Sequence, residues 1–193
     1  MRRHCDTECG VLSMNYHTKD HEVVENSLTQ ALFELMNRKP FSEITVTELV
    51  NHAGVGRATY YRNYTCKEEI IENYIYRLMM DFHNQHPVAS MSERFTEDRL
   101  IMVFRHIQPY IPLLTVLNRS GLGFLFLDLL NRSLLQIHQN DIRGEKDRIL
   151  LLAFAGAEFN IIFTDLLNNH ADQEELAEQI SGLFLGQQNT GME

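Results

Sequence analysis

The chain has 193 residues, of which 44% are hydrophobic and 22% are charged, and its net charge is −9 at pH 7. A chain of this length can bury a core without disulfide or metal staples. The acidic balance excludes a uniformly basic nucleic-acid coat, so any contact with DNA must come from a local patch of Lys and Arg. Only four prolines and no tryptophan occur, and periodic apolar segments dominate, which favours a helical protein.

Residues 1–18 show no periodicity, and we expect a mobile tail there. The three cysteines are Cys5, Cys9 and Cys66, and their spacing fits no common zinc pattern, so we expect neither a metal nor a cofactor. The first segment lacks the apolar stretch of a signal peptide, and the longest apolar runs fall short of the ~20 residues of a membrane span. We therefore expect a reduced, cytoplasmic protein without membrane contact. Met14 is an alternative start of translation.

Residues 20–38 place apolar side chains at helical spacing. Pro40 ends this first predicted helix, because proline disfavours helical geometry at the residue before it. Thr45 stands three residues before Glu48, which is the capping-box spacing that opens a second helix. Gly54 is expected to end that helix in a tight turn.

A third helix is expected over residues 57–63. Thr65, with Glu68 three residues further on, predicts the cap of a fourth helix. The stretch NQHPVASMS then interrupts the apolar pattern, and we place a domain boundary there. The first domain is predicted to span residues 19–85 and the second residues 86–193.

The second domain stays helical, which predicts an all-α fold of about nine helices. The expected segments cover residues 95–107, 111–117, 124–139 and 148–168, with a last helix that Asp172 caps. That helix places Leu176, Ile180, Leu183 and Phe184 on one side. Two such apolar helices from each of two chains would make a four-helix dimer interface, whereas the alternative is an ordinary core within one chain.

Two short helices joined by a tight glycine-containing turn form the unit that lays its second helix in the major groove of DNA. At ~100° per residue, Tyr60 and Tyr64 share one stripe of the third predicted helix and can pack inward with Val55. Arg57 and Tyr61 share another stripe, which can face outward. The alternative is that these tyrosines are only core aromatics of a helical packing unit.

The outward surface has residue types that suit DNA. An arginine early in the helix can reach a guanine edge, and a small alanine can touch a thymine methyl group. Hydroxyl groups and a lysine at a helix start suit phosphate oxygens. Residues 54–66 hold no acid, as a surface facing phosphate requires. The candidate DNA-binding residues are Gly56, Arg57, Ala58, Thr59, Tyr61, Arg62 and Lys67, although Arg62 could instead pair with Glu68 or Glu69.

The run ITVTELVNHAGVGRATYYRNYTCKEEII, preceded by ALFELMNRKPFSE, resembles the DNA-binding domain of the TetR/AcrR family of bacterial transcriptional regulators. The resemblance covers about residues 24–82. It implies an all-helical homodimer with three N-terminal DNA-binding helices and a larger C-terminal domain for effector binding and dimerisation. Gly56 stands where the family often has a serine cap, and Asn63 and Cys66 also depart from its pattern. The positions that match the family's DNA contacts are Thr47, Arg57, Ala58, Thr59, Tyr61 and Lys67.

We therefore expect a transcriptional regulator, more often a repressor than an activator in this family, that binds double-stranded DNA at a palindromic operator as a homodimer. A small-molecule effector or protein partner at the C-terminal domain would release the DNA. One alternative is a regulator that acts mainly through a protein partner, because the C-terminal half also resembles family members that control dihydroxyacetone kinase genes. A small helical enzyme is the other alternative, and no catalytic set supports it.

The sequence assigns no effector-binding residues. A pocket needs a few polar groups in an apolar wall. The polar residues of the C-terminal helices that could touch an effector are His106, Tyr110, Asn118, Asp128, His138, Glu158, Asn160 and Thr164.

Overall fold

The computed structural model describes residues 19–167 and 172–186, and every regular element in these two ranges is helical. The predicted all-α fold is therefore confirmed. The predicted tail, residues 1–18 with its two cysteines and Met14, lies outside the described residues, as does the expected end of the penultimate helix at residue 168.

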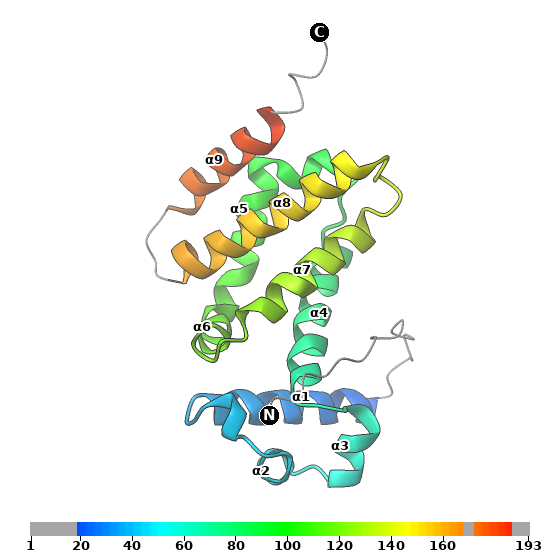
Figure 1. Ribbon diagram of the computed structural model, residues 1–193, viewed down its shortest axis with the longest axis vertical. Helices are drawn as coiled ribbons and strands as arrows, with labels where there is room; N and C mark the ends of the chain where they lie inside the picture. Colours follow the sequence, from blue (N-terminus) through cyan, green and yellow to red (C-terminus); the bar gives the residue numbers. More distant parts are fainter. Residues whose placement is uncertain (1–18, 168–171, 187–193) are drawn as a thin grey trace.

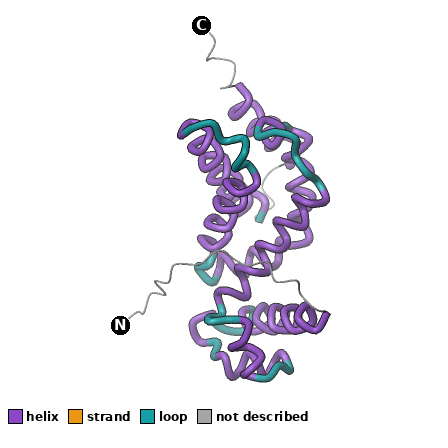
Figure 2. The backbone as a smooth tube through the Cα atoms, turned by 90° about the vertical axis from the view of Figure 1, so that its right-hand side faces the viewer, coloured by secondary structure: helices purple, strands orange, loops and turns teal. Residues whose placement is uncertain are grey.

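The N-terminal helices form a unit at one end of the molecule, and a long helix leads away from it toward the remaining helices (Figure 1). Viewed from the side, these two groups of helices follow one another along the long axis (Figure 2). The elements of the first group are α1 (Lys19–Met36), η1 (Phe41–Glu43), α2 (Val46–Ala53) and α3 (Arg57–Asn63), and the long helix is α4 (Glu68–Gln85). The elements of the second are η2 (Ser92–Phe95), α5 (Glu97–Ile107), η3 (Gln108–Tyr110), α6 (Ile111–Arg119), α7 (Gly123–Ile137), α8 (Glu145–Ile161), η4 (Ile162–Leu166) and α9 (Gln173–Gly186).

The core of the first group lies between α1, α2 and α4. Leu28, Leu32, Leu49 and Ile71 are completely buried there, and each such side chain stabilises the fold by ~1.5–3 kcal/mol relative to exposure. Ion pairs fix the neighbouring helices in place. Arg77 of α4 bonds Glu25 of α1 at 2.9 Å, and His52 of α2 lies 2.7 Å from Glu34 of α1. Because α1 touches both helices, it sets the position of α2 relative to α4.

The predicted cap of α2 is present. The Thr45 hydroxyl accepts a hydrogen bond from the Glu48 N–H at 3.2 Å. The Glu48 carboxylate pairs with Lys39. The ion pair joins the start of α2 to the chain that leaves α1.

The predicted cap of α4 is wrong. Thr65 donates from its N–H, at 2.7 Å, and from its hydroxyl to Glu69, and Glu68 takes no part in these bonds. The reason is that α4 begins at Glu68 with Lys67 as its N-cap residue. Thr65 therefore stands two residues too early to cap the helix.

The second group packs in pairs of helices. α7 lies against both α8 and α4, and α5 lies against α9. α8 begins at Glu145, earlier than expected, and Arg148 bonds Glu145 at 2.6 Å across its first turn. Asp172 caps α9 as predicted, accepting from the Glu174 N–H at 2.8 Å. Ile180 of α9 is buried, whereas Leu183 is 67% exposed.

Two helical stretches, Glu97–Arg119 and Glu145–Leu166, are long and apolar enough to cross a membrane by length and composition alone. The first is longer than the sequence suggested, because Pro109 and Pro112 fall at the starts of η3 and α6, where proline is tolerated and no break results. Each stretch also carries a buried charged side chain, Arg99 or Glu158, that packs inside the helical core. Core helices pass the same test, so this is weak evidence for a membrane span.

We predict that Thr45→Ala lowers the free energy of unfolding by ~1 kcal/mol, because the Glu48 N–H loses its side-chain acceptor. Urea unfolding followed by circular dichroism measures the change. Thr47→Ala is the matched control, since Thr47 is exposed in the same helix and should cost no more than about 0.5 kcal/mol. Equal losses in the two variants would contradict the capping role of Thr45.

Candidate nucleic-acid interface

The turn between α2 and α3 depends on Gly54. Its φ of 66° lies in the left-handed region, which side chains other than glycine rarely adopt. The Gly54 N–H donates to the Asn51 carbonyl at 3.3 Å, and the Val55 N–H donates to the Val50 carbonyl at 2.9 Å. These two bonds cap the end of α2, and Gly54 is the left-handed residue of the cap. α3 then begins at Arg57, three residues after Gly54.

α3 is held from beneath by two tyrosines. Tyr60 is completely buried and Tyr64 is 4% exposed, and their ring centroids lie 5.8 Å apart. Burial raises the pKa of both hydroxyl groups. Gly56 caps the helix without a side-chain bond, and its carbonyl accepts from the Tyr60 N–H at 3.0 Å. The inward role predicted for these two tyrosines agrees with their burial.

The opposite face of α3 is open. Tyr61 is 55% exposed, and the Arg57 guanidinium lies 5.9 Å from the centre of its ring. Gly56, Ala58 and Arg62 are also exposed. In residues 19–167 and 172–186, no carboxylate forms an ion pair with either arginine. The face therefore presents positive charge, a phenol and a small side chain at the lower end of the molecule (Figure 1).

Two further candidates lie at the edges of this face. Thr59 is half-buried, and Thr47 is exposed near the start of α2. Arg38 follows the end of α1 and lines a shallow hollow together with Thr47 and His52. The sequence did not indicate Arg38, because its proximity to α2 depends on how α1 and α2 pack. Thr47, Thr59 and Arg38 remain candidates for phosphate contact.

Lys67 is engaged elsewhere. Its ammonium donates to the carbonyl oxygens of Phe41, at 2.7 Å, and Ile44, at 2.5 Å. It also lies 4.3 Å from the centre of the Phe41 ring. Burial lowers the pKa of this ammonium. In this arrangement the side chain ties η1 to the start of α4, which gives no support to the predicted phosphate contact.

The polar residues of the second group of helices divide into two sets. His106, Tyr110 and Glu158 line a cavity, and His138 is buried next to it. The other four candidates are exposed: Asn118, Asp128, Asn160 and Thr164. The sequence did not indicate four polar residues of the cavity wall: His83, Arg94, Arg99 and Ser133. Arg94 and Arg99 fall in polar stretches, SERF and EDRL, that read as surface. Within the described ranges, no group of three His, Cys, Asp or Glu could hold a metal ion.

Comparisons with known proteins agree with this geometry. Residues 28–74 match the family described as bacterial regulatory proteins, tetR family. No curated protein matches the chain. Lin0861 from Listeria innocua is similar in structure, with a TM-score of 0.74 and 19% identity over 91% of this chain and 96% of that one.

Two further solved structures share the fold. A TetR transcriptional regulator from Streptococcus agalactiae 2603V gives a TM-score of 0.55 at 19% identity, over 86% of this chain and 97% of that one. The dihydroxyacetone kinase operon activator DhaS gives a TM-score of 0.53 at 17% identity, over 86% and 96%.

The helix-turn-helix geometry and the open cationic face of α3 define a DNA-binding regulator. Residues 28–74 match the DNA-binding domain of the TetR family of transcriptional regulators, which is the resemblance seen in the sequence.

We predict that Arg57→Ala or Tyr61→Ala weakens specific DNA binding by ~1–3 kcal/mol. Both side chains are exposed, so the fold should be unchanged by circular dichroism. Fluorescence anisotropy with labelled operator DNA measures the affinity. Arg119→Ala is the control, because this exposed arginine lies on α6 in the second group of helices. The assignment of α3 is refuted if the α3 variants bind as tightly as the control.

Proposed function

We propose that the chain is a dimeric repressor that binds a palindromic operator and releases it when its C-terminal domain binds an effector. The observation that carries this proposal is the two-sided character of α3. One side is sealed by Tyr60 and Tyr64, while the other exposes Arg57 and Tyr61, and no carboxylate of the described residues forms an ion pair with Arg57. A helix with these two sides can enter a major groove without losing its support.

Each residue of the open face has a distinct task. Arg57, at the first position of α3, reaches a guanine edge, and Ala58 allows close approach to a thymine methyl group. Tyr61, Thr47 and Arg62 bind phosphate oxygens and fix the register of the helix. Lys67 has an indirect role. Its ammonium is already bonded to two carbonyl groups, so it holds the backbone near the interface in position.

The DNA-binding domain spans residues 19–85 in this proposal, and the regulatory domain spans residues 86–193. α4 supports this division and also links the two parts. Near its middle, Arg77 pairs with Glu25 of α1. Its second half packs on α7 and lines the cavity. A ligand that prefers one position of α4 would change the separation of two recognition helices, because it acts only through different affinity for the two states.

Exposed apolar side chains on the last two helices support a dimer interface. Leu183 of α9 is 67% exposed and Ile149 of α8 is 55% exposed. Interfaces between copies bury such side chains. A second copy placed against α8 and α9 would form a four-helix arrangement and hold the two α3 helices at a fixed spacing. Half-sites read by such dimers are about one helical turn, ~34–36 Å, apart or somewhat more.

We predict that Leu183→Glu converts the dimer to monomers, because a charged side chain would be buried without a partner. Light scattering coupled to gel filtration gives the mass. Val23→Glu is the matched control: Val23 is 64% exposed on α1, far along the chain from the interface proposed on α8 and α9. A dimer that survives Leu183→Glu would place the interface elsewhere.

The proposal as a whole is tested by recovering the genomic fragments that the chain binds. We expect palindromic sites, including one upstream of its own gene, whose affinity falls steeply with salt. Absence of a gel shift at low salt would reject DNA regulation through direct binding and favour action through a protein partner. A cytoplasmic location follows from the same function.

A further inference from the structure

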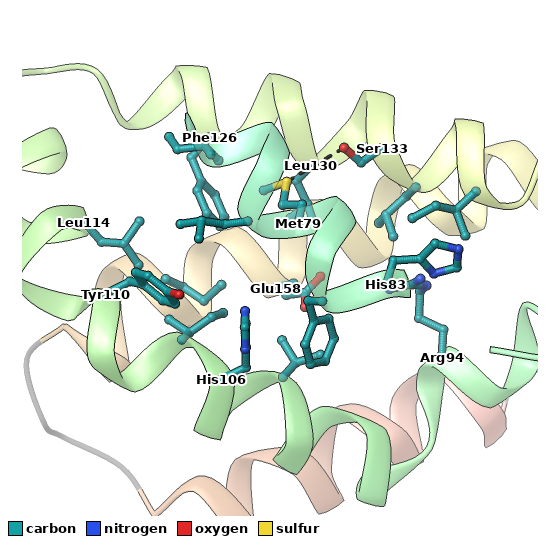
Figure 3. Close-up of a pocket in the computed structure, with 18 of the residues that line it drawn as sticks. Met79, His83, Arg94, His106, Tyr110, Leu114, Phe126, Leu130, Ser133 and Glu158 are labelled. Atoms are coloured by element: carbon teal, nitrogen blue, oxygen red, sulfur yellow. Dashed lines mark hydrogen bonds between the residues drawn. The ribbon is translucent and has the colours of Figure 1, made fainter. Parts of the chain in front are cut away.

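A cavity lies between α4, α5, α6, α7 and α8 (Figure 3). The centre of a water molecule can move through about 100 Å³ of this cavity. A single buried water needs roughly 10–15 Å³ of such space. Tyr110 and Leu114 lie at one end, and His83 and Arg94 lie beside each other at the other end (Figure 3). Most of the wall is apolar. The cavity therefore has room for a small organic molecule and becomes polar toward one end.

Three charged side chains in the wall are buried and carry polar atoms without partners. Arg94 and Arg99 are each 6% exposed, and Glu158 is 4% exposed. Within the described residues, the atoms that lack a hydrogen-bond partner include Nη2 of Arg94, Nε and Nη2 of Arg99, and Oε2 of Glu158. Buried polar groups in folded proteins are nearly always paired. Free guanidinium N–H groups in a cavity wall are therefore donors that await an acceptor.

Both guanidinium groups are held in place by other contacts. Nε of Arg94 donates to Nε2 of His138 at 2.9 Å, and Nδ1 of His138 lies 2.9 Å from the Asp141 carboxylate. Because Nε2 accepts, the proton of His138 is on Nδ1 and the ring is neutral. Nη1 of Arg99 donates to the His86 carbonyl at 2.7 Å. The N–H groups that remain free are thus oriented before any ligand arrives, which lowers the cost of ordering them.

The charges at this end of the cavity select an anion. Arg94 and Arg99 contribute two positive charges, and Glu158 contributes at most one negative charge. Burial lowers the pKa of Arg94 to about 10, so it is still charged at neutral pH, and burial lowers the pKa of His83, which keeps that ring neutral. No carboxylate in the described ranges lies within ion-pair distance of either arginine. At least one positive charge is left uncompensated.

We propose that the cavity binds a small organic monocarboxylate. Its carboxylate accepts from the free N–H groups of Arg94 and Arg99, which suit the planar, two-oxygen geometry of this group. Its apolar body packs against Phe126 and Leu130 of α7. The buried Glu158 carboxyl group in the same wall disfavours a second negative charge, so we expect a ligand with one carboxylate. This inference names the effector class of the proposed regulator, and it rests on the proposed function only for the effect on DNA.

The test uses three probes that share one apolar body: phenylacetate, phenylacetamide and phenethylamine, which are anionic, neutral and cationic. Each is titrated into the full-length chain without DNA by isothermal titration calorimetry. We expect phenylacetate to bind, and the other two to bind at least ~tenfold more weakly, as loss of a buried charge pair implies. Equal or tighter binding of the amide or the amine would overturn the proposal.

Two substitutions are expected to change the affinity for phenylacetate in opposite directions. Arg99→Gln should weaken phenylacetate binding at least ~tenfold, because one charged donor pair is lost. Glu158→Gln keeps the shape of the side chain and removes its charge, so it should tighten phenylacetate binding several-fold. Arg119→Gln, at an exposed position on α6, should leave affinity unchanged. Where Arg99→Gln fails to fold, Glu158→Gln decides the matter, and unchanged or weaker binding in that variant counts against the proposal.

A separate measurement by fluorescence anisotropy asks whether phenylacetate releases operator DNA. A chain that binds phenylacetate but no DNA would reject the proposed function and leave the ligand class standing. A chain that binds DNA but none of the three probes would reject the ligand class and leave the DNA-binding function standing.

Discussion

A helix of seven residues is too short to persist in water by itself, so α3 keeps its shape only because Tyr60 and Tyr64 are buried beneath it. The two rings fill the space under the helix and contact each other. The left-handed turn at Gly54 lets α3 begin at Arg57, with only three residues between it and the end of α2. Every feature of the open face follows from this anchoring, since Arg57 and Tyr61 can point outward only when their neighbours point inward.

The support beneath α3 extends through α4 into the second group of helices. The Lys67 ammonium joins the start of α4 to η1, and Arg77 joins the same helix to α1. Further along, α4 contributes Phe82 and His83 to the cavity wall. One continuous helix thus touches both the DNA-binding unit and the buried arginines. A change in either place must be accommodated by the other, because packed helices move as units rather than bending freely.

Local signals in the sequence predicted much of the DNA-binding unit. The spacing of Thr45 and Glu48, the position of Gly54 and the inward stripe of α3 are each set by residues close together in the chain. Contacts between distant segments could not be predicted in this way. Lys67 binds carbonyl groups more than twenty residues earlier. The local cap of α4 was predicted wrongly for another reason: α4 starts later than the pattern suggested, so Thr65 bonds Glu69. The buried arginines were missed because polar residues near a helix start usually face solvent.

The acid-free face of α3 belongs to a chain whose net charge is −9. The chain as a whole therefore repels a duplex, whereas Arg57 and Arg62 on α3 attract it. Dissolved salt screens the repulsion between the acidic chain and DNA beyond about 8 Å under physiological conditions. An acidic face is therefore repelled only when it comes close to the duplex. Binding to DNA of arbitrary sequence depends almost entirely on the attraction between basic side chains and phosphate groups. In the proposed function, an acidic body thus disfavours accumulation on bulk chromosomal DNA and leaves the chain free to reach a specific site.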